Sequence, residues 1–389
     1  MKKDDLVYKE YCVGCGLCES CGVTKLVEKD TGYMFPEQID SKWMMQICPC
    51  SSKNYEQLDK TNIWGKYLVR YSGWSTDDQI RIKASSGGVL TALAIYLIES
   101  KQVDGIIHVC KSKEDPTQTE ICISTSRDEL IERCGSRYSI SHPLQELKSL
   151  DVSKKYAFIG KPCDVAVLKN YEKIDSSIRS VVPVKLSFFC AGLPSKAAQM
   201  KLLNELKCNK KCVDLNYRGN GWPGDVYATD EVGNEYRLDY ETAWGKILGR
   251  DIMKMCRLCP DGVGEMADIS CGDYWYLNEY NKPDFSEHEG RNVIFVRTQI
   301  GKQILEDAEK RKYIMVQEDV KDTDLYNCQK YQYIRKSTMI SKVLALKICR
   351  KQSPFFNLKQ SIHYAKKSSL KVLIRTFLGT VKRACKGVF

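Results

Sequence analysis

Cysteines near the start of the chain have the spacing that iron–sulfur clusters use. Cys12, Cys15 and Cys18 form a C-x-x-C-x-x-C run, and a distant Cys-Pro pair follows at Cys48. Three closely spaced thiolates completed by a remote Cys-Pro are a ligand pattern of 4Fe-4S clusters. We therefore predict that these four thiols hold one 4Fe-4S cluster. Cys21 is the alternative fourth ligand, and a zinc site is the competing interpretation of the pattern.

A second C-x-x-C, formed by Cys256 and Cys259, stands far downstream. Taken alone, this pair is ambiguous between zinc, an iron–sulfur cluster, dithiol redox chemistry and chance. Two other cysteines, Cys163 and Cys190, each come at the end of a predicted strand. Together the four thiols are enough for a second 4Fe-4S cluster.

The elements predicted around Cys163 and Cys190 explain how they could act as ligands. Residues 156–160 and 181–189 have the pattern of short buried strands, and a helix begins at Cys163. In open α/β sheets, ligands bind beyond the carboxyl ends of the strands. A helix N-terminus also lowers the pKa of a thiol, which favours a thiolate at Cys163. Cys271 lies inside a third predicted strand and is left out of the cluster.

Two glycine-containing segments could approach a phosphate group. The loop 84–88 opens an apolar helix at 89–99, where backbone N–H groups and the helix dipole favour a phosphate. A plain serine cap with glycines for close packing is the alternative. The segment 219–224 matches G-x-G-x-x-G, but Pro223 interrupts it and residues 225–238 alternate like a hairpin. We therefore reject this segment as a dinucleotide fingerprint.

Cysteine content and hydropathy limit the kinds of protein that this chain can be. The chain has 19 cysteines among 389 residues, and no apolar leader segment is visible at its start. This combination favours metal ligands over disulfides and predicts a cytoplasmic location. No run of about 18 apolar residues is present, so no membrane-spanning helix is predicted.

Positive charge is concentrated at the end of the chain. Residues 325–389 contain 15 Lys and Arg and no Asp or Glu, whereas residues 1–324 contain 45 basic and 49 acidic residues. We predict a basic amphipathic tail that lies peripherally on an anionic membrane surface at its inner face, with docking onto an acidic protein as the alternative. Nucleic acid is not an expected partner, because no reader motif accompanies the charge.

Seven stretches, in order, resemble one family, the beta subunit of coenzyme F420 hydrogenases and dehydrogenases. Plant hydroxymethyl-chlorophyll reductase and bacterial homologues in polysaccharide gene clusters belong to the same group. The matching stretches are ASSGGVLTALAIYLIE at 84–99, VDGIIHV at 103–109, GSRYS at 135–139, FIGKPCDVAVLK at 158–169, FFCAGLPS at 188–195, YRGNGWPG at 217–224 and CRLCPDGVGEMADISCGDYW at 256–275. Only the basic tail lies outside the resemblance.

The resemblance implies a flavin, FAD before FMN, together with one or two 4Fe-4S clusters. It also implies that the cysteines at 163, 190, 256 and 259 lie together. The residues that it implies for the flavin pocket are Ser85, Ser86, Gly87, Gly88, Arg137, Tyr138, Lys161 and Pro162. Of these, Lys161 or Arg137 could stabilise the negative charge of a reduced flavin.

The expected fold is α/β (α+β), with a mixed-sheet flavin and iron–sulfur domain, a small ferredoxin-like module and a helical tail. The expected divisions are a ferredoxin-type 4Fe-4S domain at 1–60, the two parts of the family domain at 61–150 and 151–324, and the tail at 325–389.

The expected function is that of an iron–sulfur flavoprotein oxidoreductase. Electrons would pass between a ferredoxin-type carrier, the clusters and a flavin that reduces or oxidises a small or lipid-linked substrate, with polysaccharide biosynthesis as one setting. A non-catalytic electron-transfer subunit of a larger redox complex is the alternative, and a zinc-stapled accessory protein at a membrane is a third interpretation. No catalytic acid or base can be assigned, and His108 is interpreted as a packed strand residue.

Overall fold

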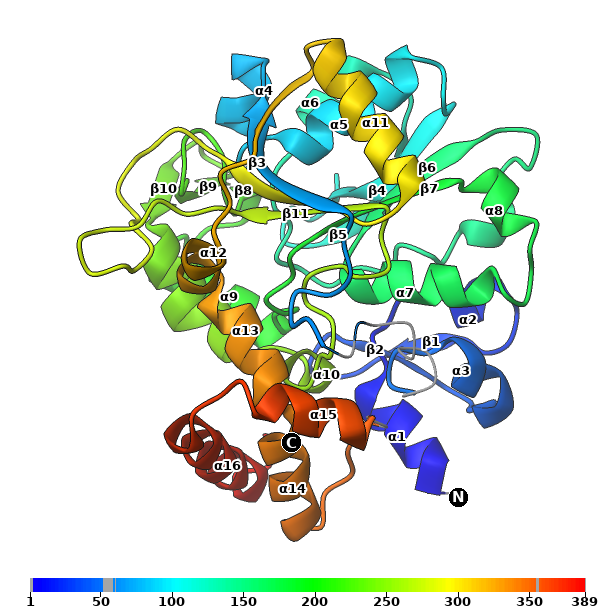
Figure 1. Ribbon diagram of the computed structural model, residues 1–389, viewed down its shortest axis with the longest axis vertical. Helices are drawn as coiled ribbons and strands as arrows, with labels where there is room; N and C mark the ends of the chain where they lie inside the picture. The colour runs from blue at the N-terminus through cyan, green and yellow to red at the C-terminus, as the bar shows by residue number, and fades with distance from the viewer. Residues whose placement is uncertain (1–2, 52–58, 60, 355–356, 389) are drawn as a thin grey trace.

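An eight-stranded sheet organises the structure, a computed structural model that describes residues 3–51, 59, 61–354 and 357–388 (Figure 1). The strand order is β13-β3-β12-β11-β7-β6-β4-β5. The strands are β3 (Val69–Ser75), β4 (Gly105–Lys111), β5 (Thr119–Ser124), β6 (Tyr156–Gly160), β7 (Val184–Phe188), β11 (Ile269–Asp273), β12 (Asn292–Val296) and β13 (Ile314–Gln317). The mixed-sheet α/β fold predicted from the sequence is therefore confirmed.

The central strands of this sheet are parallel and the outer strands are antiparallel. β11, β7, β6 and β4 pair in parallel, in that order. β5 pairs antiparallel on one edge, and β12, β3 and β13 pair antiparallel on the other side. Parallel neighbours bring their carboxyl ends to the same edge of a sheet, so the ends of β6, β7 and β11 meet there.

Helices cover both faces of the sheet. α5 (Val89–Glu99) and α11 (Gln299–Lys310) pack on one face with Ala157, whereas α7 (Pro162–Tyr171) packs on the other face with Phe158. The neighbouring residues Ala157 and Phe158 contact opposite layers because successive strand side chains alternate. α5 is apolar around most of its circumference, which suits a helix that is buried almost completely.

A smaller antiparallel sheet lies on the left of the main sheet in Figure 1. It contains β8 (Cys212–Asn216), β9 (Val226–Asp230) and β10 (Glu235–Leu238), and α9 (Lys196–Glu205) packs against it. β9 and β10 form the hairpin predicted after the glycine-rich segment. A strand rather than a helix therefore follows those glycines, as the rejection of a dinucleotide fingerprint requires.

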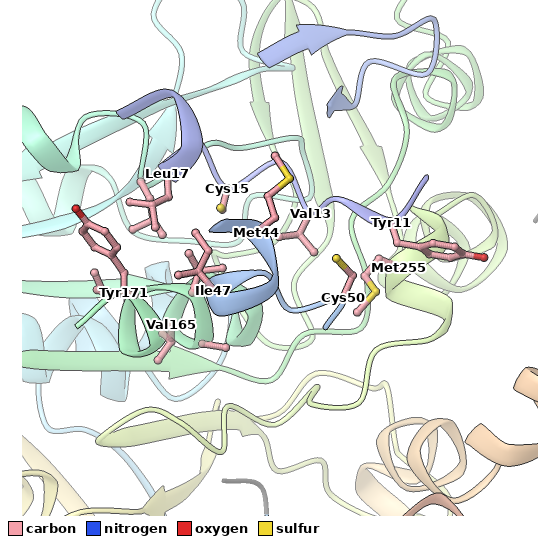
Figure 2. Close-up of a cluster of buried hydrophobic side chains, with 14 of the residues drawn as sticks. Tyr11, Val13, Cys15, Leu17, Met44, Ile47, Cys50, Val165, Tyr171 and Met255 are labelled. Atoms are coloured by element: carbon pink, nitrogen blue, oxygen red, sulfur yellow. The ribbon is translucent and has the colours of Figure 1, made fainter. Parts of the chain in front are cut away.

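The described N-terminal residues share a hydrophobic core with α7. Their elements are α1 (Lys3–Tyr11), α2 (Leu17–Ser20), β1 (Leu26–Glu28), β2 (Met34–Pro36) and α3 (Ser41–Ile47). Figure 2 shows Leu17 and Ile47 near Val165 and Tyr171 of α7, and all four side chains belong to one buried cluster. The boundary predicted at residue 60 lies outside the described residues.

The described C-terminal residues form a run of helices. They are α12 (Asp322–Cys328), α13 (Lys330–Ser337), α14 (Met339–Ile348), α15 (Leu358–Ala365) and α16 (Leu370–Cys385). Contrary to a simple amphipathic tail, α13 buries polar residues, among them Gln332, Arg335 and Lys336. In the part of the chain that the structure describes, no helix has the length and apolar character needed to cross a membrane.

One buried arginine, Arg297, connects the sheet by hydrogen bonds to the segments around residues 64–66 and 263. Arg297, directly after β12, is 7% exposed. Its guanidinium donates to the carbonyls of Trp64 at 3.2 Å, Lys66 at 3.0 Å and Val263 at 2.8 Å. The Ser270 hydroxyl of β11 accepts a further bond at 3.0 Å. The segment after the second C-x-x-C is therefore fixed to the sheet by this side chain.

Replacing Arg297 with Met should lower the free energy of unfolding by about 3 kcal/mol or more, because several buried acceptors lose their donor. Urea denaturation followed by tryptophan fluorescence measures the change. Arg311→Met, at the exposed end of α11, is the matched control and should change stability by less than about 0.5 kcal/mol. Equal stabilities of the two variants would contradict the role of Arg297.

His108 makes the fold sensitive to acid. It lies on β4, is 8% exposed and has its Nε2 2.8 Å from the Ser124 hydroxyl of β5. Burial, reinforced by Arg133, lowers the pKa of His108 to about 4. The unfolded chain therefore binds this proton more tightly than the folded chain does. The stability that the neutral ring provides is complete above about pH 6.5 and is lost as the pH falls toward 4.

Wild type should therefore lose about 3 kcal/mol more stability than His108→Gln between pH 6.5 and pH 4, since one pKa unit is worth about 1.4 kcal/mol. Denaturation curves at a series of pH values test this difference. His363→Gln, which changes an exposed histidine of α15, should keep the pH dependence of the wild type. Parallel curves for wild type and His108→Gln would show that the ring does not titrate in this way.

Candidate functional site

The second group of predicted cluster ligands comes together beyond the carboxyl edge of the sheet. Cys163 lies in the first turn of α7, directly after β6, and Cys190 lies two residues beyond β7. Cys256 lies in α10 (Lys254–Arg257), and Cys259 follows it. The Cys190 thiol contributes to a raised pKa at each of the other three, so it lies within electrostatic reach of all of them.

Backbone hydrogen bonds join the two loops that carry these thiols. The Leu193 N–H donates to the Cys256 Sγ at 3.3 Å. The Cys190 N–H donates to the Gly262 carbonyl at 2.8 Å. The loop after β7 and the loop after the C-x-x-C are thus held against each other, although more than 60 residues separate Cys190 from Cys256.

Burial controls the protonation of this group. It raises the pKa of Cys256 to about 12 and that of Cys259 to about 11, and it raises the pKa of Cys163 and Cys190 as well. At Cys163, burial and the neighbouring Asp164 outweigh the helix N-terminus, so the predicted lowering of this pKa is wrong. The thiolate form needs a positive partner here, which a bound metal supplies when it displaces the proton.

The donor set fits an iron–sulfur cluster. Four thiols are soft ligands that suit iron–sulfur clusters and zinc. Among the described residues, no group of three or more Cys, His, Asp or Glu converges closely enough to hold a single metal ion. Each thiolate of a 4Fe-4S cluster binds a different iron, so cluster ligands stand farther apart than the ligands of one ion. The four thiols are therefore a donor set that suits a 4Fe-4S cluster, and zinc remains the competing interpretation.

The N-terminal thiols form another group, of which Cys18 lies in α2 and Cys12 and Cys15 directly precede this helix. Gly14 and Gly16 have φ angles of 63° and 91°, which let the chain turn sharply between the three cysteines of the run. The Gly14 N–H donates to the Cys12 Sγ at 3.3 Å. Backbone N–H groups directed at thiol sulfur atoms are a feature that tunes iron–sulfur clusters.

The structure favours Cys48 over Cys21 as the fourth member of the N-terminal group. Cys48 contributes to the raised pKa of all three thiols in the C-x-x-C-x-x-C run. Of these three, the Cys21 thiol contributes to the raised pKa of Cys18 alone, and it also interacts with the Tyr171 hydroxyl of α7. Cys50, which the sequence did not single out, places its thiol in hydrogen-bond contact with that of Cys48.

A buried ion pair lies between the two groups of thiols. Lys161 Nζ and Asp164 Oδ2 are 2.8 Å apart, and Asp164 also accepts from the Lys161 N–H at 3.1 Å. Asp164 is within electrostatic reach of Cys15 in one group and of Cys163 in the other. Burial alone would lower the pKa of Lys161, but Asp164 and the nearby thiols raise it. The ammonium group therefore stays charged between the two groups.

Residues 135–142 connect this ion pair with the predicted flavin loop. The Ser136 N–H donates to the Ser85 hydroxyl at 2.6 Å, and Lys161 Nζ donates to the Ser141 hydroxyl at 2.8 Å. Pro162 begins α7 directly after Lys161, where its fixed φ suits a helix start. Three stretches that the resemblance assigned to one flavin pocket are thus brought together.

The following residues also contact the N-terminal thiols. His142 Nδ1 lies 2.6 Å from the Gly14 carbonyl oxygen, and the Leu144 N–H donates to the Cys15 carbonyl at 2.9 Å. A Cβ added to Gly16 would lie 2.7 Å from the Gln145 backbone nitrogen. Residues 135–145 therefore contact, in turn, the loop at 84–88, the Lys161–Asp164 ion pair and the N-terminal group of thiols.

The serine hydroxyls of the loop at 84–88 are engaged within the protein. The Ser86 hydroxyl donates to the Arg291 carbonyl at 3.0 Å and accepts from Asn292 at 3.1 Å. The Val89 N–H at the helix start donates to the Asn292 side chain. A Cβ on Gly87 would meet backbone atoms at 2.8 to 2.9 Å. Close packing therefore accounts for Gly87, and a phosphate site at the helix start stays a prediction.

Arg137 offers a buried donor that the fold leaves unused. Its Nη1 donates to the Leu215 carbonyl at 3.0 Å, but its buried Nε has no hydrogen-bond partner among the described residues. Burial lowers the pKa of Arg137. The adjacent Tyr138 ring lies 4.6 Å from the Trp244 ring. A guanidinium with a spare donor beside aromatic rings fits a ligand that has both phosphate groups and a planar ring system, as a flavin nucleotide has.

Arg218 and Asp273 form a buried pair that sequence reasoning missed. The guanidinium binds the carboxylate through two bonds of 2.9 and 3.2 Å. Arg218 also lies 5.3 Å from the Trp275 ring centre, and Trp275 stacks on Trp222 at 4.5 Å. The pair fixes the glycine-rich turn at 219–224 to the end of β11. The sequence does place an acidic residue, Asp273, at the end of a predicted strand. Nothing in the spacing of the sequence links it to Arg218.

Two family models match the chain, and both describe the beta subunit of coenzyme F420 hydrogenase/dehydrogenase. The model for the N-terminal part of that subunit matches residues 70–148, and the model for its C-terminal part matches residues 153–322. Together they cover well over half of the chain. The N-terminal thiols and helices α13 to α16 lie outside both matched regions.

Known proteins show the same relationship. The coenzyme F420 hydrogenase subunit beta of Methanosarcina barkeri is 30% identical over 251 residues, which are 62% of this chain and 78% of that relative. The F420-dependent formate dehydrogenase subunit beta of Methanocaldococcus jannaschii is 27% identical over 252 residues, which are 63% of this chain and 60% of that relative.

A solved structure also matches the fold. A chain of the F420-reducing NiFe hydrogenase complex from Methanosarcina barkeri aligns with a TM-score of 0.55 at 22% identity. The alignment covers 75% of this chain and 97% of that chain.

Proposed function

Because the chain belongs to the coenzyme F420 hydrogenase/dehydrogenase beta subunit family, we propose that it is the electron-transfer subunit of a larger redox assembly. The observation that supports this proposal is that Asp164 of the buried Lys161–Asp164 ion pair is within electrostatic reach of Cys15 from one group of thiols and of Cys163 from the other. Two 4Fe-4S clusters held there would be near neighbours. The matched relatives are themselves named as subunits of F420-dependent enzymes.

Each group of residues would have its own part in this function. The cysteines at 12, 15, 18 and 48 would hold one cluster, and those at 163, 190, 256 and 259 the other. When bound, such clusters carry single electrons, and FAD exchanges two, so their combination links hydride chemistry to one-electron carriers. Arg137 would pair its free Nε with the flavin nucleotide, and the charged Lys161 would offset negative charge between the clusters.

The partner implied by this arrangement is a protein that donates or accepts electrons, either a ferredoxin-type carrier or a catalytic subunit. The N-terminal group would serve as the contact for that partner. Substrate turnover by this chain alone, including a role in polysaccharide biosynthesis, has less support, because both named relatives are subunits. An enzyme acting on a small or lipid-linked substrate remains the second candidate.

Anaerobic purification of the full chain tests the proposal directly. We expect about eight iron atoms, about eight acid-labile sulfides and one flavin per chain, as two 4Fe-4S clusters and one FAD require. Iron, sulfide and flavin analysis measures these contents. Zinc in place of iron, together with no flavin, would refute the redox function and favour the zinc-stapled accessory protein.

Single cysteine variants test the grouping in the same preparation. Cys259→Ala and Cys48→Ser should each remove about four iron atoms and the electron paramagnetic resonance signal of one cluster, and each should spare the other signal. Cys21→Ser is the matched control for Cys48→Ser and should retain both signals, because Cys21 contacts Tyr171. Retention of all iron in Cys259→Ala would overturn the second group.

We also propose that α16 seats the protein on an anionic membrane surface. Leu370, Ile374 and Leu378 occur four residues apart and are 72%, 50% and 60% exposed. They line one shallow groove together with Lys371 and Arg375. A row of cations thus runs beside a row of apolar side chains, the arrangement of an interfacial helix. Because the last 65 residues contain no acidic residue, anionic lipid is the complementary surface.

Vesicle sedimentation tests this attachment. Wild type should bind vesicles rich in phosphatidylglycerol and not vesicles of phosphatidylcholine alone. Reversing the charge of Lys371 and Arg375 to Glu should weaken binding at least about tenfold, since each cation near such a surface is worth about 1 kcal/mol. Replacing Leu370, Ile374 and Leu378 with Ser should also weaken it.

The matched control replaces three exposed apolar residues elsewhere, Val152, Met200 and Val232, with Ser. This variant should bind as the wild type does. Absence of wild-type binding to the anionic vesicles would reject the membrane proposal and favour an acidic protein as the partner of α16.

A further inference from the structure

Arg335 of α13 reaches the second group of thiols from outside the family-matched part of the chain. Its side chain is buried, and the whole residue is 4% exposed. Nη2 donates to the Cys190 carbonyl at 2.9 Å, and Nη1 lies 3.4 Å from the Ala191 carbonyl oxygen. Gln332, one turn earlier on α13, donates to the same Cys190 carbonyl at 3.1 Å. The loop that carries one predicted ligand is therefore held by this helix.

The charge on Arg335 is not balanced by a carboxylate of the described residues. No Asp or Glu among them forms an ion pair with Arg335, whereas the next residue, Lys336, pairs with the buried Glu265. A buried, uncompensated guanidinium is costly unless an anion lies nearby. The candidate anions are the sulfur atoms of the second group, because the guanidinium is bound to the backbone of Cys190 and the Cys190 N–H is bound to Gly262, in the segment after the C-x-x-C.

Neighbouring groups show that the surroundings of this site are electropositive. Lys342 of α14 is held by the carbonyls of Arg257 and Arg335 at 3.0 and 3.3 Å. Burial, then Arg335 and Arg383, lowers the pKa of Lys342 to about 7. Arg335 and Arg383 therefore lie within electrostatic reach of Lys342, which itself contacts Arg257, between Cys256 and Cys259.

Gly262 provides the space that the guanidinium occupies. A Cβ built on Gly262 would lie 1.4 Å from Arg335 Nη2 and 2.2 Å from Gln332 Oε1. Gly262 is also the residue whose carbonyl accepts from the Cys190 N–H. Any larger residue at position 262 would displace the guanidinium from its place beside the Cys190 loop.

We propose that Arg335 is a positioning residue that raises the reduction potential of the cluster held by Cys163, Cys190, Cys256 and Cys259. The inference rests on the proposed function, since it requires that cluster. Reduction adds one electron and hence one negative charge, with no bond made or broken. A fixed buried cation stabilises the added charge, and the net charge around a cluster is one of the factors that set its potential.

A redox titration of the full chain, followed by electron paramagnetic resonance, tests the proposal. Arg335→Gln should shift the ratio of oxidised to reduced second cluster about tenfold toward the oxidised form at a fixed applied potential, which is about 59 mV for a one-electron couple. The N-terminal cluster should keep its potential. Arg335→Lys retains the charge and should recover most of the shift.

Two further variants separate charge from simple loss of structure. Gly262→Ala keeps Arg335 in the chain but displaces its guanidinium, so it should shift the potential in the same direction. Lys330→Gln removes an exposed cation from the same helix and should leave the potential unchanged. If Arg335→Gln loses the cluster, comparison of Gly262→Ala with Arg335→Lys decides the question.

An unchanged potential in an iron-loaded Arg335→Gln or Gly262→Ala protein would overturn the role of Arg335 while leaving the proposed function intact. Wild-type protein without iron would instead refute the proposed function, and this inference with it. The two failures are therefore distinguished by the iron content of the wild type.

Discussion

The buried ion pair between Lys161 and Asp164 is the interaction on which the arrangement of both thiol groups depends. Asp164 caps the start of α7 through the Lys161 N–H, and the same carboxylate holds the Lys161 ammonium. Removing one member of such a pair leaves an uncompensated buried charge, at a cost of about 3–5 kcal/mol. One contact, between Lys161 and Asp164, thus fixes the start of the helix that carries Cys163. The same contact holds the ammonium charge of Lys161 between the two groups of thiols.

Residues 135–145 connect this ion pair by hydrogen bonds to the other parts of the site. Through Ser141 they bind Lys161, through Ser136 they bind the loop at Ser85, and through His142 they reach the N-terminal group. The segment lies between helix α6 (Arg127–Glu132) and the strand β6 and contains no helix or strand, and a short 3-10 turn at Leu147–Ser149 follows it. Its shape is therefore imposed by the three surfaces that it contacts.

Local patterns in the sequence predicted the elements that carry the site. The strands around Tyr156–Gly160 and Ile269–Asp273 and the helix after Gly88 were readable because each is a short apolar run next to turn residues. The grouping of Cys163 with Cys256 came from the family resemblance, since nothing local links residues that far apart. The raised pKa of Cys163 was not predictable, because burial by distant segments outweighs the helix terminus.

The role of α13 could not be predicted from the sequence either, because its contacts are also with residues far away in the chain. Its basic residues read as part of a charged tail, and Arg335 finds its partner, the Cys190 carbonyl, 145 residues earlier in the chain. The sequence pattern of a helix reports which residues share a face. It does not report whether that face meets water, lipid or a buried loop, and α13 and α16 differ in this respect although both are basic and contain no acidic residue.

The distribution of the two thiol groups along the chain has a consequence for how the protein matures. The first group is complete once the ribosome has translated Cys48, whereas the second spans residues from Cys163 to Cys259 and depends on the parallel strands β6, β7 and β11. If the second group holds a cluster as proposed, metal delivery to it would follow formation of the sheet, because Cys163 and Cys190 follow separate strands and Cys256 lies in α10. On the proposed function, sheet assembly would set the order of cofactor insertion, and a nascent chain that stalls before Cys256 would have only half of its second set of thiols.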